Sequence, residues 1–131
     1  MPALIVRTLA VTSSSSAIAL VEVAGEIDMA SAPELSERLH AVAASDIVLE
    51  LSGVDFMSAA GAQVLLDVRG RLARRDAQLV LANPSGAVRR ILTVTGLRNV
   101  FASGTTVADA MLRLTAVRMI QRCVAIRPAA S

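Results

Sequence analysis

The chain has 131 residues, of which 54% are hydrophobic and 2% aromatic, so it is long enough for one domain with a core of Ala, Val, Leu and Ile. Its formal net charge is +2, and its arginines are scattered over several elements without Trp or Tyr, a pattern that argues against direct nucleic-acid binding. The sequence shows no apolar run of about 18 residues and no leader pattern, so we expect a cytoplasmic protein without membrane contact.

Two strands are predicted at the start of the chain. Residues 4–11 and 17–24 are rich in apolar and β-branched residues, and the serines of 13–16 form a polar link between them. This pattern predicts a hairpin. The apolar run of the second strand is too continuous for a single buried face, so we expect both faces to be partly covered and Glu22 to lie toward an edge.

A first helix is predicted after Gly25, which permits a bend. The sequence from Ser31 to Glu34 has the form of a capping box. Pro33 stands in the first turn, where a backbone N–H would have no partner within the helix, so its absence costs nothing. The inward face of this helix is expected to consist of Leu35, Leu39 and Val42.

The centre of the chain predicts a buried strand followed by a helix. Residues 47–51 suit a strand covered on both faces, and Ser52 and Gly53 are expected to end it. Ser58 stands at the N-cap position, where its hydroxyl can accept a hydrogen bond from the backbone of the first turn. Apolar and small residues at helical spacing form the inward face: Gly61, Val64, Leu65, Val68 and Leu72.

The second half of the chain continues the alternation. Residues 78–82 predict a strand, 87–95 a helix and 100–101 a short edge strand. Thr105 or Thr106 can cap a last helix. Strands that alternate with helices predict an α/β layer structure, and the first hairpin makes its sheet mixed. The buried positions of the last helix are expected to be Val107, Ala110, Met111 and Leu114.

Three motifs in register resemble those of one protein family. They are Gly25–Asp28, with the sequence GEID, Leu51–Gly61, with the sequence LSGVDFMSAAG, and Gly96–Leu97 followed by Val100–Phe101. Over about residues 4–115 the chain resembles STAS domains, the family of bacterial anti-sigma factor antagonists. The resemblance implies a STAS-like fold, a mixed central sheet of about five strands with about four helices mainly on one side.

We therefore expect a STAS domain over residues 1–115 and a C-terminal extension over 116–131, a helical continuation that ends in a loose tail.

The resemblance also implies a partner-binding surface. After a Phe-Met pair the family motif usually reads Asp, Ser, Ser or Thr, then Gly, and a partner kinase phosphorylates the hydroxyl just before the Gly. Ala60 occupies that position here, so the acceptor is missing, and Ser58 would be a displaced acceptor two residues earlier. The residues carried over to the surface are Asp28, Met29, Ser58, Ala59, Ala60 and Gly61.

Two of the chemically notable residues keep two interpretations each. Asp28 either organises its loop by accepting backbone N–H bonds or contributes to the partner surface. Cys123, the single cysteine, is either an inert small side chain or a redox site that joins two chains. His40 fits a solvated residue near a helix end better than a catalyst.

The function expected from the resemblance is transcription regulation, as in a stress response. The chain would bind an anti-sigma factor, a kinase-like ATPase, and so free a sigma factor. The sequence offers no nucleophile with a base, metal cluster or phosphate loop, so we expect neither an enzyme nor a cofactor or metal. The alternative is a STAS scaffold or a small-ligand-sensing module in a larger signalling assembly. For the antagonist we expect a monomer or homodimer, whereas a retained ligand or a high oligomer would indicate the alternative.

Overall fold

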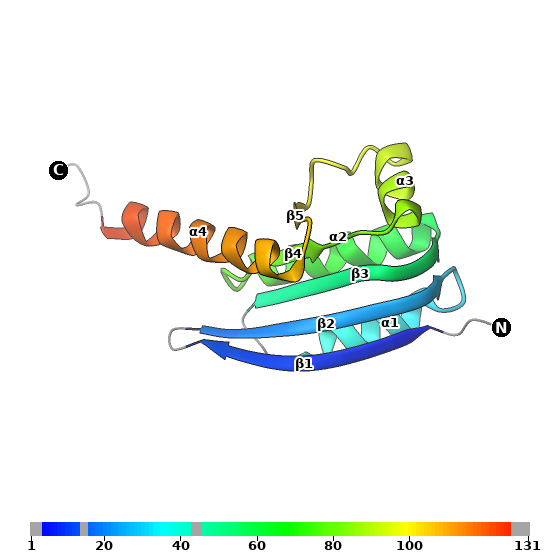
Figure 1. Ribbon diagram of the computed structural model, residues 1–131, viewed down its shortest axis with the longest axis horizontal. Helices are drawn as coiled ribbons and strands as arrows, with labels where there is room; N and C mark the ends of the chain where they lie inside the picture. The colour runs from blue at the N-terminus through cyan, green and yellow to red at the C-terminus, as the bar shows by residue number, and fades with distance from the viewer. Residues whose placement is uncertain (1–3, 14–15, 43–45, 127–131) are drawn as a thin grey trace.

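The computed structural model describes residues 4–13, 16–42 and 46–126, and five strands within them form one sheet. The strands are β1 (Ile5–Ser13), β2 (Ser16–Ile27), β3 (Asp46–Met57), β4 (Leu79–Ala82) and β5 (Ala102–Gly104). They lie side by side in chain order (Figure 1). β1 pairs with β2 in the antiparallel sense and all other neighbours are parallel, so the predicted hairpin and mixed sheet are confirmed.

Four helices within the described residues cover the two faces of this sheet. They are α1 (Ala32–His40), α2 (Ala59–Ala73), α3 (Gly86–Val94) and α4 (Val107–Ile126). The first three pack on one face and α4 on the other, which agrees with helices mainly on one side (Figure 1). No helix in the described part of the chain is long and apolar enough to cross a bilayer. The expected loose tail lies mostly outside the described residues.

The sheet carries an apolar layer on each face. Leu49 of β3 and Leu65 of α2 are fully buried on the side of the first three helices. On the other side, Ala110 and Leu114 of α4 cover Val48 of β3. Full burial of such an aliphatic side chain as Val or Leu contributes about 1.5–3 kcal/mol, so both layers stabilise the fold.

β3 does not end at Ser52 and Gly53, as their turn-forming character predicted, but continues to Met57. Its pairing with β2 shifts register twice in this stretch, and each shift leaves one extra residue on β3, as in a β-bulge. A Cβ atom on Gly53 would lie 2.8 Å from the Cβ of Ala24, so the two strands can approach only because Gly53 has none. Ser52 and Gly53 therefore form part of a β-bulge and not a turn.

Two further predictions about strands are wrong. Glu22 lies between Arg7 of β1 and Glu50 of β3, because β2 is an inner strand and not an edge. The last strand begins at Ala102, after the predicted residues 100–101. Phe101 is instead buried in the core, which explains why an apolar residue stands there.

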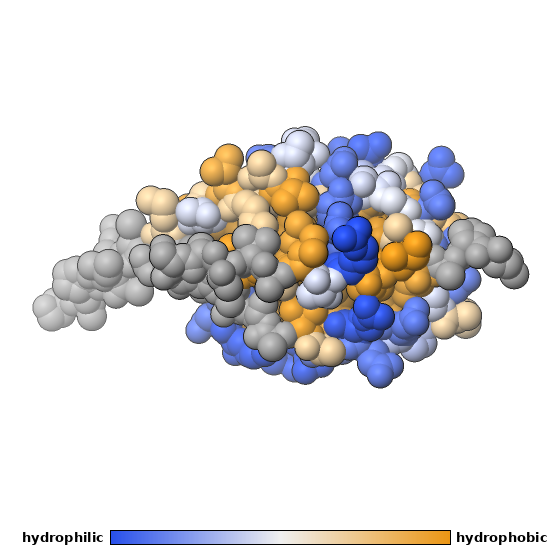
Figure 2. Space-filling view, turned by 60° about the horizontal axis from the view of Figure 1, so that its bottom comes forward, coloured by the Kyte–Doolittle hydropathy of each residue, from blue (hydrophilic) through white to orange (hydrophobic). Residues whose placement is uncertain are grey.

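The β1 edge of the molecule exposes single apolar side chains. Ile5 and Leu9 are 55% and 41% exposed. Between them Arg7 forms an ion pair with Glu22, at 3.9 Å. Figure 2, in which this edge comes forward, shows hydrophobic and hydrophilic residues interleaved. Scattered exposed apolar residues of this kind are usual on a protein surface.

Candidate functional site

The ends of β2 and β3 bring the two halves of the expected partner surface together. Ile27 pairs with Met57, and the N–H of Ser58 donates to the carbonyl oxygen of Ile27 at 2.8 Å. Asp28 is the next residue after Ile27, so it lies beside the start of α2. Two motifs that are distant in the chain thus share one end of the sheet.

Hydrogen bonds order the loop that carries Asp28. Its Oδ1 atom accepts from the Ser31 N–H at 2.8 Å, and its own N–H donates to Ser31 Oγ at 2.9 Å. The Ser31 hydroxyl lies 2.9 Å from the Glu26 carbonyl oxygen and 3.0 Å from Asp28 Oδ1, and it can donate to either. The hydrogen bond from the Ser31 backbone is the main cause that lowers the pKa of Asp28 from 3.8. Asp28 therefore organises its loop, as one of its two interpretations required.

Ser31 precedes α1, but the predicted capping box with Glu34 is wrong, because no side chain caps this helix. The Ser31 hydroxyl is committed to the Asp28 loop instead. Pro33 does stand in the first turn, as predicted.

Ser58 occupies the N-cap position of α2, but its hydroxyl does not form the predicted cap. The Ser58 Oγ atom is buried and has no hydrogen-bond partner among the described residues. The Ser58 carbonyl oxygen accepts from the N–H groups of Gly61 and Ala62, at 3.0 and 3.2 Å. Because an unpartnered buried hydroxyl costs about 1–3 kcal/mol, this position is not optimised for capping.

Gly61 lets α2 start directly on the strand ends. The residue is buried, and an added Cβ would lie 2.7 Å from Ile27 Cγ2 and 2.9 Å from Met57 Cγ. Ala60 is half-buried, and Ala59 is the exposed residue of this first turn. In this first turn Ala59 is fully accessible to a partner and Ala60 is partly accessible. Gly61 is buried, and its role is to let the helix pack closely on the strand ends.

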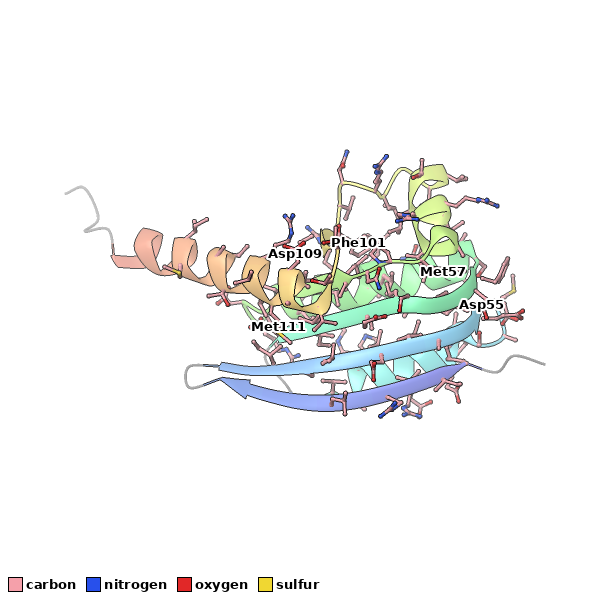
Figure 3. The ribbon with its side chains drawn as sticks, viewed as in Figure 1. Asp55, Met57, Phe101, Asp109 and Met111 are labelled. Carbon is pink, nitrogen blue, oxygen red and sulfur yellow. The ribbon has the colours of Figure 1, made fainter. Side chains whose placement is uncertain are left out.

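A groove of about 350 Å³ lies beside this helix start and was not predicted from the sequence. Phe56 and Met57 at the end of β3 contribute one wall, and Arg90 and Val94 of α3 contribute the other. Figure 3 shows Met57 at this end of the sheet, next to α3. Phe56 and Val94 are 48% and 76% exposed, and Met29 on the Asp28 loop is 81% exposed. Apolar side chains thus gather at the same end of the sheet as the expected surface.

The sequence held one usable signal for this groove. In α3, Val88 and Leu92 are buried and fill the inward face, which leaves Val94 as an apolar residue on the outer side. Phe56 gave no such signal, because the bulges of β3 decide which side chains at the strand end are buried.

The other chemically notable residues lie outside this site. The pKa of His40 is lowered, first by burial and then by the nearby Arg71, and its Nε2 atom has no hydrogen-bond partner in the described part of the chain. Cys123 falls on α4, where its side chain is outside the described residues. Within the residues that the structure covers, no three His, Cys, Asp or Glu side chains are grouped so as to hold a metal ion.

Known proteins match both the sequence and the fold. The anti-sigma-B factor antagonist of Bacillus subtilis (strain 168) is 33% identical over 82 residues, which are 61% of this chain and 75% of that protein. A crystal structure of an anti-sigma factor antagonist from Mycobacterium paratuberculosis has a TM-score of 0.70 at 28% identity, and the match covers 84% of this chain and 94% of that one.

The phosphorylated form of SpoIIAA, a Bacillus cell fate determinant, shares the fold with a TM-score of 0.59 at 18% identity, over 82% of this chain and 97% of that one. The family model of the STAS domain matches residues 10–110. This match covers the end of β1 and all of β2 to β5. The chain therefore belongs to the STAS domain family.

Proposed function

We propose that this chain is an anti-sigma factor antagonist, which acts by binding a protein and not by catalysis. The observation that carries the proposal is the apolar groove beside the start of α2, on the end of the sheet where the family motifs meet. The matched relatives are themselves anti-sigma factor antagonists. The partner is an anti-sigma factor of the kinase-like ATPase kind, and its capture in the cytoplasm frees a sigma factor.

Three exposed apolar side chains supply the contact area. Phe56 and Val94 line the groove, Met29 lies on the Asp28 loop at the same end of the sheet, and all three lose contact with water when a partner covers them. Aromatic residues and Met are enriched at protein interfaces, and a few such side chains carry most of the binding energy. Arg90 on the groove wall offers a positive charge to an acidic partner residue. Asp28 acts indirectly, because it orders the loop that presents Met29.

Phosphorylation at the family position does not regulate this chain, because Ala60 has no hydroxyl. In a protein that has the acceptor, a phosphate adds about −1.5 to −2 charges near neutral pH, enough to repel a partner across an interface. Ser58 does not replace the acceptor, since its Oγ atom is buried and a kinase reaches it only if the start of α2 opens. The chain thus binds in a persistently active form.

Calorimetric titration against the anti-sigma factors of the same genome tests this function. Phe56→Ala should weaken binding by at least about tenfold, because truncation of a central aromatic side chain costs about 2 kcal/mol or more. Leu112→Ala is the matched control, since Leu112 is 69% exposed but lies on α4, on the other face of the sheet. Binding to none of the anti-sigma factors refutes the function, and equal losses in the two variants refute the surface.

A further inference from the structure

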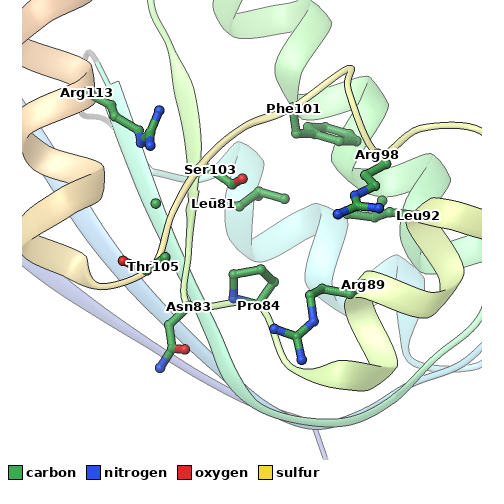
Figure 4. A pocket seen from close by; sticks show the side chains of 11 residues that line it. Leu81, Asn83, Pro84, Arg89, Leu92, Arg98, Phe101, Ser103, Thr105 and Arg113 are labelled. Carbon is green, nitrogen blue, oxygen red and sulfur yellow. The ribbon is translucent and has the colours of Figure 1, made fainter.

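A second cavity, of about 360 Å³, lies on the opposite side of α3 from the groove (Figure 4). Arg89 and Leu92 of α3 line this cavity, whereas Arg90 and Val94 line the groove. It opens where β4 and β5 end. Ligands of parallel α/β sheets commonly bind at the carboxyl ends of strands, so the position suits a small-molecule site.

The floor of the cavity is apolar and held in place by close packing. Leu81, Leu92 and Phe101 line it and are buried. A Cβ atom on Gly104 would lie 2.5 Å from the backbone nitrogen of Ala110, so β5 lies directly against the first turn of α4. The wall from β5 to α4 is therefore preformed.

Three arginines from different parts of the chain surround the opening. Arg89 of α3 and Arg98 of the following loop stand on one side, and Arg113 of α4 on the other (Figure 4). Arg113 forms an ion pair with Asp109, at 3.5 Å, whereas Arg89 and Arg98 form none with any described residue. No acidic residue of the described chain lines the cavity. Like charges gathered in this way repel one another unless an anion lies between them.

We propose that this cavity binds a small organic anion, in which an apolar ring or chain carries a phosphate or carboxylate group. The guanidinium groups of Arg89 and Arg98 hold the anionic end, since their planar donor groups match the oxygens of both anions. The apolar part lies on Leu81 and Phe101, and the Ser103 hydroxyl on the rim adds a donor. A volume of about 360 Å³ suits a small ligand, because such sites span about 300–1,000 Å³. The inference does not depend on the proposed partner, because the ligand binds the chain alone.

Calorimetric titration of the full chain with four probes tests the site. The probes are phenyl phosphate, benzoate, inorganic phosphate and phenol. Phenyl phosphate or benzoate should bind at least about tenfold more tightly than inorganic phosphate and phenol, because only the first two satisfy both the arginines and the apolar floor. If phenyl phosphate binds more tightly than benzoate, the site prefers a phosphate group, and the reverse order indicates a carboxylate. If neither exceeds both single-function probes, the proposal is overturned.

Matched arginine variants show where the better probe binds. Arg98→Gln should weaken its affinity by about tenfold or more, since the charge-assisted hydrogen bonds are lost. Arg69→Gln removes the same charge from the exposed side of α2, outside the cavity, and should leave the affinity unchanged. Equal weakening by both variants would mean diffuse attraction to a positive chain and would overturn the site. Circular dichroism verifies folding, and Arg89→Gln carries the same expectation if Arg98→Gln fails to fold.

Discussion

Gly61→Ala tests how closely the start of α2 packs on the strand ends. The added methyl group would lie 2.7 Å from Ile27 Cγ2 and 2.9 Å from Met57 Cγ. Met57 can adjust, but Ile27 is fully buried and branched at Cβ, so it has no free rotamer to adopt. Overpacking costs about 1–3 kcal/mol and the higher helix propensity of Ala returns about 1 kcal/mol. We therefore expect the free energy of unfolding to fall by about 0–2 kcal/mol.

Gly70→Ala in the same helix is the matched control. Apart from the neighbouring backbone of the same helix, no described atom lies within 4 Å of a Cβ built there, so only the propensity gain remains. The free energy of unfolding should rise by about 0.5–1 kcal/mol. Urea denaturation followed by circular dichroism measures both variants, and their difference of about 1–3 kcal/mol isolates the overpacking. If Gly61→Ala proves as stable as Gly70→Ala, the close packing of α2 on Ile27 is refuted.

Three further predictions concern the same end of the sheet. Ser58→Ala should keep or raise the free energy of unfolding, because it removes an unpartnered buried hydroxyl. Thr106→Ala should lower the free energy of unfolding by about 1 kcal/mol, since Thr106 Oγ1 accepts from the N–H of Asp109 in the first turn of α4, at 3.0 Å. If urea denaturation shows that both variants lose the same free energy of unfolding, this difference between Ser58 and Thr106 is refuted. In an NMR titration the pKa of Asp28 should lie below 3.8 and rise only part of the way toward that value in Ser31→Ala, which removes the side-chain hydrogen bond but keeps the main one from the Ser31 backbone N–H. A carboxyl whose folded pKa is lowered contributes stability above its unfolded pKa, and this stability is lost as the pH falls through the folded pKa. Ser31→Ala should therefore lose slightly less stability below pH 3.8 than the native chain does, and an unchanged loss would count against a role of the Ser31 hydroxyl. Ala60→Ser should gain one phosphate from the partner kinase and ATP and then lose binding, whereas a phosphate on the native chain, seen by intact mass, would show that another residue is the acceptor.

Hydrophobic periodicity located the elements well, because the core follows it. In α2 the residues predicted to face inward, such as Val64, Leu65 and Val68, are all buried. The prediction failed at Ser52 and Gly53, because a bulge depends on how β3 pairs with β2. That pairing is a long-range contact, and local turn propensity does not contain it.

The candidate site was predicted only in part. The family motifs placed Asp28 and Ser58 on one surface, and hydrogen bonding through Ile27 brings them side by side. The wall that Val94 contributes was missed, because α3 follows much later in the chain and meets the end of β3 only in the folded state. The N-cap preference of Ser is a statistical one, and at Ser58 the hydroxyl turns into the protein without reaching the N–H groups of the first turn.

The most direct test of persistent antagonism is one calorimetric titration of the native chain against its anti-sigma factor. One sample of the chain is first incubated with this anti-sigma factor, the proposed kinase, and with ATP and is then separated from both, and a second sample is treated identically with ADP. We predict binding with the same Kd in both samples, because Ala60 offers no acceptor and the Ser58 hydroxyl is buried. Binding that disappears after incubation with ATP, or that is absent from both samples, would contradict the proposed function.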